Sequence, residues 1–206
     1  MRRVFGIVAM ISGIAVTTLS AQTPAARPLS PPGTAATQVG GDLANNVYSG
    51  NWIEVTYSRP LLRQRVNIFG AGADYGKTVN AGAPVWRAGA NQTTRFKTEV
   101  ALSFGGKTLP AGEYSMFVDL KPNAWTLIFS NWPAQQKYDA NDKTALWGSF
   151  GYTPDKDVLR TPMKVEALAF SIDELTINFV DVTKTGGRLA IMWDKTLATA
   201  AFTVAK

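Results

Sequence analysis

Two short stretches hold the residues of this chain whose types could recognise a ligand. The first reads Tyr57-Ser58-Arg59-Pro60, and the second reads W-R-A-G-A-N-Q-T-T from residue 86 to residue 94. Guanidinium groups bind carboxylates and phosphates through paired hydrogen bonds, and aromatic rings supply the apolar walls of a pocket. We therefore predict a site for a carboxylate, a phosphate or a polyol, built from Tyr57, Arg59, Trp86, Arg87 and Asn91.

Basic residues gather around these two stretches. Residues 55–98 contain seven Arg and Lys residues and a single acid, Asp74, so seven minus one gives a local charge of +6. A buried guanidinium needs a partner, which is supplied either by distant acidic segments or by a bound anion. The alternative to a ligand site is a structural brace, in which Arg59 and Arg87 bind carbonyl groups or carboxylates such as Glu113 or Asp119.

The chain has neither Cys nor His. This excludes disulfide scaffolds, thiol nucleophiles, Ser-His-Asp triads and histidine-based metal sites. The remaining enzymatic alternative is a carboxylate-based hydrolase that uses Glu99 and Glu113, which flank one predicted hairpin. We favour a non-catalytic protein that binds a polar or anionic small ligand, such as a saccharide or an envelope component, over a hydrolase or a purely structural or interaction domain. We predict no cofactor and no metal ion.

Two other patterns have simpler structural interpretations. Residues 71–78 read A-G-A-D-Y-G-K-T, the loosest form of a phosphate-binding loop, but the residues after them do not predict the helix that such a loop requires. The oxygen-rich run Asp139-Ala140-Asn141-Asp142 lacks the Gly and the closing Glu of a calcium loop. We interpret the first as a glycine-rich loop and the second as an Asx-rich turn.

The amino-terminal residues have the layout of a signal peptide. Arg2 and Arg3 precede an apolar run over residues 4–19, and Ser20 and Ala21 are small. We expect residues 1–21 to be removed, leaving a periplasmic or secreted protein without a membrane span. Without the two arginines, 19 basic and 15 acidic residues remain, and this net charge of +4 argues against a nucleic-acid partner.

The rest of the chain predicts one all-β domain after a tether. Residues 22–46 are rich in Pro, Ala, Thr and Gly and predict a disordered segment, followed by a single domain over residues 47–206. Apolar and polar residues alternate, as in strands, over residues 52–58, 94–104, 114–120, 125–129, 158–166, 175–182, 188–194 and 200–204. We predict an antiparallel β-sandwich, with a jelly roll or a barrel as alternative topologies, and an irregular, aromatic-rich segment over residues 131–154.

The ordered set of motifs resembles a known family. These motifs are Y-S-R-P at 57–60, R-x-x-I-F-G at 65–70, Y-G at 75–76, W-R-x-G-A-N-x-x-T at 86–94 and L-P-A-G-x-Y-S at 109–115. Together they resemble the bacterial exported family known as domain of unknown function family 2911, from about Trp52 to the carboxyl end. The resemblance implies an exported, β-rich domain and no catalytic residues. Family members pass almost directly from Tyr-Gly to Trp-Arg, whereas Lys77 to Pro84 intervene here and place extra loop beside the predicted site.

Overall fold

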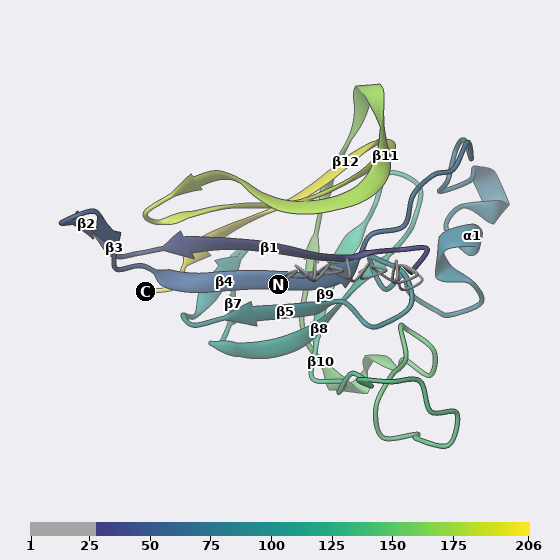
Figure 1. The fold of residues 1–206 in the computed structure, drawn as a ribbon, viewed down its shortest axis with the longest axis horizontal. Helices are drawn as coiled ribbons and strands as arrows, with labels where there is room; N and C mark the ends of the chain where they lie inside the picture. The colour runs from purple at the N-terminus through teal and green to yellow at the C-terminus, as the bar shows by residue number, and fades with distance from the viewer. Residues whose placement is uncertain (1–27) are drawn as a thin grey trace, which may run out of the picture.

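The computed structural model describes residues 28–206, which form two antiparallel sheets packed face to face (Figure 1). The larger sheet has the order β1(Pro32–Val39), β4(Asn51–Ser58), β5(Arg95–Thr98), β8(Gly112–Asp119), β9(Thr126–Ser130), β10(Asp157–Pro162). The smaller sheet has the order β11(Lys164–Thr183), β12(Gly186–Val204), β6(Leu102–Phe104), β7(Lys107–Leu109). A small hairpin of β2(Leu43–Ala44) and β3(Val47–Tyr48) projects from one end. The predicted all-β sandwich is confirmed.

Strand β1 lies inside the segment that was predicted to be a tether. It pairs with β4 along its whole length, from Pro32 opposite Ser58 to Val39 opposite Asn51. Only Ala35 and Val39 of this strand are buried. An edge strand is held mainly by its backbone ladder, so it forms without the apolar content that the prediction required. The tether prediction is wrong for residues 32–39 and for β2 at residues 43–44, while the predicted signal peptide and residues 22–27 lie outside the described residues.

The strand predicted over residues 94–104 is divided between the two sheets. β5 belongs to the six-stranded sheet and β6 to the four-stranded sheet, and the chain crosses between them at residues 99–101. Phe96 and Phe104 are both fully buried in the shared core. The alternation of inward-facing apolar residues therefore continues where the chain passes from one sheet to the other. This explains why the sequence pattern predicted a single strand.

The predicted strands after residue 157 merge into a short strand and one long hairpin. β11 has 20 residues and β12 has 19, and their register shifts between Ala167 and Ile172 and again before Thr176. Asp194 in β12 has a left-handed φ of 51°. Such bulges bend a strand and interrupt the alternation of apolar and polar residues. The sequence pattern therefore predicts separate strands where the structure has one continuous strand.

Over residues 28–206, helical structure is confined to single turns: η1(Gly72–Asp74), α1(Lys77–Asn80) and η2(Pro154–Lys156). The sequence predicted no helix after Gly76, and this prediction is wrong by one turn, because Lys77–Asn80 form α1. The turn ends at Ala81 in the left-handed region, which is why it does not continue. Within residues 28–206, no helix combines the length and the apolar character needed to cross a membrane.

The core has two parts. The main cluster fills the space between the sheets and ends in four contacting aromatic rings, Phe69, Trp86, Trp125 and Trp193. A second cluster lies on the outer face of β8 and β9, where Phe117 and Ile128 pack against Val85, Leu146 and Tyr152. The irregular segment 131–154 therefore covers the outside of the sheet.

Candidate functional site

The W-R-A-G-A-N-Q-T-T loop is fixed at both ends to strand β8. Trp86 and Val118 exchange two backbone hydrogen bonds of 2.8 Å, and the N–H of Met116 donates to the carbonyl oxygen of Thr94 at 2.9 Å. Between these points the chain leaves the sheet and returns to it. The loop therefore projects from the end of the sandwich that is opposite the β2–β3 hairpin (Figure 1).

Local hydrogen bonds define the shape of this loop. Ala88 and Asn91 both have left-handed φ values, 47° and 57°. The hydroxyl of Thr94 donates to the carbonyl oxygen of Ala88 at 3.2 Å, and the hydroxyl of Thr93 donates to the carbonyl oxygen of Gly148 at 2.7 Å. A Cβ atom on Gly89 would lie only 3.1 Å from the carbonyl oxygen of Ser58, so the loop packs closely against the end of β4.

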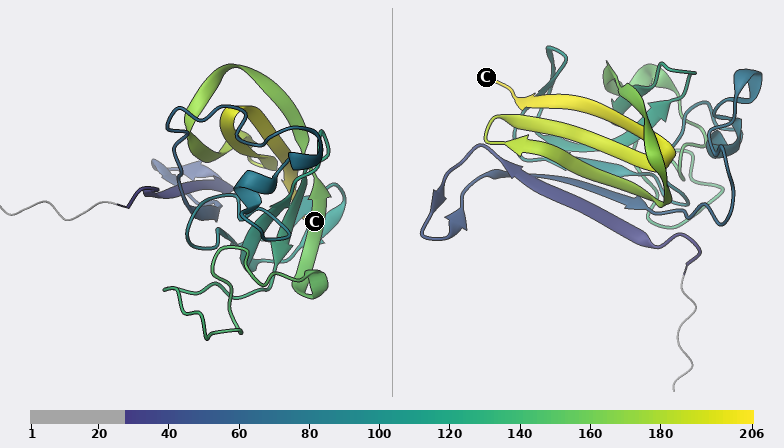
Figure 2. Two further views of the ribbon diagram at one scale, coloured as in Figure 1. Left: turned by 90° about the vertical axis from the view of Figure 1, so that its right-hand side faces the viewer. Right: turned by 90° about the horizontal axis from the view of Figure 1, so that it is seen from above.

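A pocket of about 210 Å³ lies beside this loop, and we call it the arginine pocket. Its lining includes Trp86 and Trp193, two buried core residues whose rings stack with their centres 6.2 Å apart. Its lining residues are Pro60, Arg65, Thr78, Val79, Ala81, Trp86, Arg87, Gly89, Ala90, Asn91 and Trp193. Figure 2 (left) shows this end of the molecule, with α1 and its neighbouring loops in front of the strands. The extra loop over residues 77–84 does lie beside the predicted site.

Arg87 is the most buried charged residue bordering this pocket, with 8% of its surface exposed. Its Nη1 donates to the carbonyl oxygen of Asn91 at 2.8 Å, and its guanidinium lies 5.0 Å from the centre of the Phe150 ring. A Cβ atom on Gly148 would fall 2.2 Å from Nη1, so only glycine fits against this guanidinium. Burial lowers the pKa of Arg87 below its ordinary value, yet an arginine remains charged at neutral pH.

Arg65 is the second guanidinium at the pocket. Its Nε and Nη2 donate to the carbonyl oxygens of Leu62 at 2.8 Å and Leu61 at 2.6 Å, and it lies 5.8 Å from the centre of the Trp193 ring. Among residues 28–206, neither Arg65 nor Arg87 forms an ion pair with a carboxylate. Arg65 was not among the predicted site residues, although it lies in a basic run with one acid and opens the R-x-x-I-F-G motif.

Tyr57 and Arg59 lie outside the arginine pocket. The Tyr57 hydroxyl accepts from the N–H of Ile177 at 2.9 Å and lies 3.3 Å from its carbonyl oxygen, which links the two sheets. Arg59 forms an ion pair with Glu174 of β11, and its side chain packs against Gly33 of β1. Tyr57 and Arg59 therefore do not join Trp86, Arg87 and Asn91 at this pocket. Arg59 acts as the structural brace that was the alternative interpretation, with Glu174 as its partner instead of Glu113 or Asp119.

The two candidate carboxylates of the hydrolase alternative have separate surroundings. Glu99 accepts the backbone N–H of Trp52 at 2.8 Å, while Glu113 pairs with Arg95 at 2.9 Å. They border different hollows on the outer face of the larger sheet. This arrangement gives the hydrolase no support.

The Asx-rich run forms turns, as the sequence analysis proposed. Asp139 accepts the N–H of Asn141 and Asp142 accepts the N–H of Thr144, both at 2.8 Å. Over the described part of the chain, no group of three or more acidic residues is placed to hold a metal ion.

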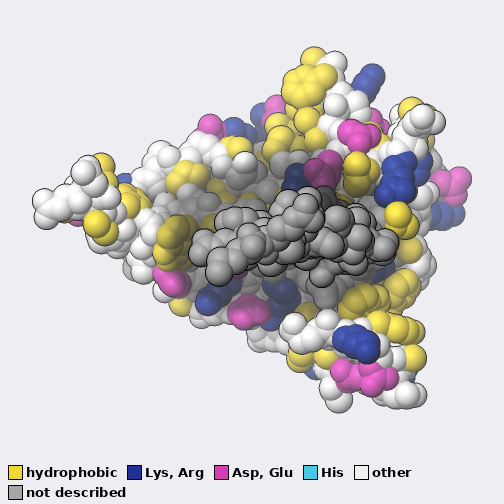
Figure 3. Space-filling view, in the orientation of Figure 1, with side chains coloured by type: hydrophobic (Ala, Val, Ile, Leu, Met, Phe, Trp, Pro, Cys, Tyr) yellow, Lys and Arg dark blue, Asp and Glu magenta, His cyan; other side chains and the backbone are white. Residues whose placement is uncertain are grey.

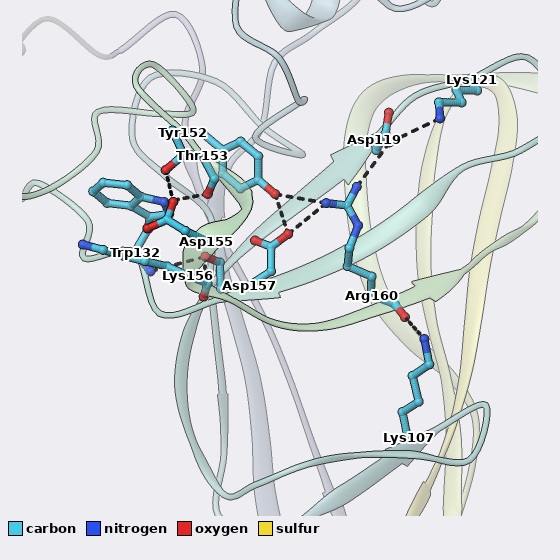
Figure 4. Close-up of polar contacts among 11 residues, drawn as sticks. Lys107, Asp119, Lys121, Trp132, Tyr152, Thr153, Asp155, Lys156, Asp157 and Arg160 are labelled. Carbon is cyan, nitrogen blue, oxygen red and sulfur yellow. Dashed lines mark hydrogen bonds and ion pairs between the residues drawn. The ribbon is translucent and has the colours of Figure 1, made fainter.

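A polar network fixes segment 131–154 to the sheet (Figure 4). Arg160 of β10 donates to Asp157 at 2.9 Å and to Asp119 of β8 at 3.2 Å. The Tyr152 hydroxyl donates to Asp157 at 2.6 Å, and burial, followed by this hydrogen bond, raises the pKa of Tyr152 well above its ordinary value. Tyr152 therefore stays protonated and anchors the segment that carries Gly148 and Phe150 against Arg87.

Fold and site together define a β-sandwich with a small basic pocket formed by loops at one end. Residues 41–202 match the model of the family described as "Protein of unknown function (DUF2911)", and the chain belongs to this family. No curated protein and no solved structure matches the chain.

Proposed function

We propose that this chain is an exported protein that binds a small anion in the arginine pocket. One observation carries the proposal: two guanidinium groups, those of Arg65 and Arg87, border the same pocket, and neither has a carboxylate partner among residues 28–206. Arg87 is buried, whereas Arg65 is exposed to solvent. For Arg87, removal from water without a counter-charge is unfavourable. A bound anion would supply the missing charge.

The size of the pocket favours a small ligand. About 210 Å³ is below the range of roughly 300–1,000 Å³ that is typical of sites for drug-sized molecules. Sulfate, phosphate or a short carboxylate fits this volume better than a saccharide does. The fork of a guanidinium also matches the paired oxygens of such anions.

The test is calorimetric titration with sulfate and with phosphate at constant ionic strength. We expect wild-type protein to bind, and we expect Arg87→Ala and Arg65→Ala to weaken binding at least about tenfold, which corresponds to about 1.4 kcal/mol. Arg63→Ala is the matched control, because Arg63 is a nearby arginine that binds the carbonyl oxygen of Leu29 and does not line the pocket. Equal affinity in wild type and Arg87→Ala would overturn the proposal.

Thermal unfolding of Arg87→Ala separates the pocket from a brace. If Arg87 balanced a buried charge, its removal would cost roughly 3–5 kcal/mol. Because its protein partners are a carbonyl oxygen and an aromatic ring, we expect a smaller loss, of about 1 kcal/mol.

The proposal of export rests on the amino-terminal sequence. Arg2 and Arg3, the apolar run and the small residues that follow it favour cleavage near Ala21. Fractionation of cells that express the full chain, followed by amino-terminal sequencing of the product, tests this. An uncleaved product in the cytoplasm would contradict it.

A further inference from the structure

Segment 131–154 contains a second and larger pocket, which we call the aromatic pocket. Its volume is about 670 Å³, and its lining includes Tyr138, Trp147 and Phe150 together with Asp139, Asp142 and Lys143. This volume lies within the usual range for a small-molecule site, as does the combination of apolar walls with a few polar groups. In Figure 3 the lobe at the lower right, where Figure 1 places this segment, carries hydrophobic, basic and acidic side chains side by side.

A single buried glutamine holds the loop around this pocket in shape. The Nε2 of Gln135 lies within 3.0–3.2 Å of the carbonyl oxygens of Asp139, Asp142 and Ala145. Its Oε1 accepts the N–H of Asp139 at 3.0 Å. These bonds join one side chain to three points of the loop, so the pocket is organised before any ligand arrives. Such preorganisation reduces the entropy that binding would otherwise cost.

Aromatic ring faces are available in this pocket. Tyr138 is 60% exposed and Phe150 is 47% exposed, although both are large apolar side chains. The rings of Tyr138 and Trp147 lie 5.8 Å apart at an interplanar angle of 59°, so they form two inclined walls. A pyranose ring presents a face of C–H groups, which packs against aromatic rings, and a rim of hydroxyl groups.

Polar groups around these walls match the hydroxyl rim of a sugar. Asp139 and Asp142 each use Oδ1 for the turn, which leaves each carboxylate with further capacity to accept a hydrogen bond. The hydrogen bond from the Thr144 side chain lowers the pKa of Asp142, which keeps this carboxylate an acceptor. Lys143 donates to the carbonyl oxygen of Ala140 at 2.6 Å and has further N–H groups to donate.

The charges of the lining nearly cancel. The lining carries two carboxylates, Asp139 and Asp142, and one ammonium group, Lys143, so two negative charges and one positive charge give a net charge of −1. A pocket without a strong excess of either charge has little reason to select an ion. We propose that the aromatic pocket binds a neutral saccharide, with its ring against Tyr138 and Trp147 and its hydroxyl groups on Asp139, Asp142 and Lys143.

Tryptophan fluorescence and calorimetry test this with the methyl glycosides of glucose, galactose, mannose and N-acetylglucosamine, and with cellobiose and maltose. We expect at least one of these sugars to change the fluorescence and to bind wild-type protein. Trp147→Ala should weaken binding at least tenfold, and Asp142→Asn should weaken it severalfold. Circular dichroism establishes that each variant is folded, and Asp142→Asn keeps the aromatic walls in case Trp147→Ala disturbs the loop.

Trp52→Ala is the matched control, because Trp52 is a half-exposed tryptophan on the outer face of the larger sheet. The proposal is overturned if none of the six sugars binds, if Trp52→Ala loses binding while Trp147→Ala retains it, or if tetramethylammonium binds more tightly than every sugar. Trp147→Ala should keep wild-type affinity for sulfate. This readout distinguishes failure of the saccharide site from failure of the arginine pocket.

Discussion

Arg59 and Arg87 occupy similar motifs, yet the structure uses them differently. Arg59 forms an ion pair with Glu174 on the other sheet. Arg87 instead donates a hydrogen bond to a carbonyl oxygen of its own loop and lies over the ring of Phe150. Arg59, which we call part of the closed corner together with Tyr57 and Glu174, has a carboxylate as its counter-charge. Arg87 borders the arginine pocket and has no carboxylate partner among residues 28–206. A buried arginine needs a counter-charge, and this need can be predicted from the residue type. The surrounding fold decides whether a carboxylate of the protein or a ligand supplies that counter-charge.

The largest expected effect comes from Trp86, which serves both the core and the arginine pocket. It is 1% exposed and contacts the rings of Phe69, Trp125 and Trp193. We expect Trp86→Ala to lower the free energy of unfolding by about 3–5 kcal/mol in urea denaturation. The same change at exposed Trp52 should stay within about 0.5 kcal/mol. A small effect at Trp86 would show that the pocket wall is separate from the core.

Tyr57→Phe tests the closed corner with a smaller effect. The substitution removes only the hydroxyl that meets both backbone groups of Ile177, so these buried groups lose a partner. We expect a loss of about 1–3 kcal/mol in the free energy of unfolding, with unchanged affinity for sulfate. If sulfate binding fell while stability held, Tyr57 would belong to the ligand site after all.

The ion pair of Arg59 and Glu174 should contribute less to the free energy of unfolding than the Tyr57 hydroxyl does. About a third of each side chain is exposed, at 35% and 30%, so solvent screens the interaction. A double-mutant cycle with Arg59→Ala and Glu174→Ala should give a coupling energy of about 0.5–1 kcal/mol. Both single variants should bind sulfate as wild type does. Loss of binding in Arg59→Ala alone would place Arg59 at the pocket.

The smallest expected effect is that of pH on sulfate binding. The chain has no His, and sulfate keeps its charge between about pH 5.5 and 8.5. A base with a lowered pKa loses its charge only as pH rises through that value, and for an arginine this lies well above the tested range. Calorimetry should therefore give a constant affinity. An affinity that falls between pH 6 and 8 would require a titrating group outside the two arginines.

Much of the fold followed from local patterns. The alternation in residues 52–58 predicted β4, and Trp86, Arg87 and Asn91 were selected from one motif and do border one pocket. Strand β1 was missed because its residues are small and polar, and its stability comes from the ladder with β4. Arg65 opens the R-x-x-I-F-G motif, but it was missed because its place beside Trp193 and Trp86 depends on the tertiary fold.

The sequence by itself determined the period-two pattern, the family and the local excess of basic residues, because these depend on residue types and on short spacings. Only the tertiary structure decided which arginine forms an ion pair with a carboxylate. Glu174 is 115 residues away from Arg59, and Phe150 is far along the chain from Arg87. Electrostatic pairing depends on distance in space, and that distance is set by how the two sheets and segment 131–154 pack together.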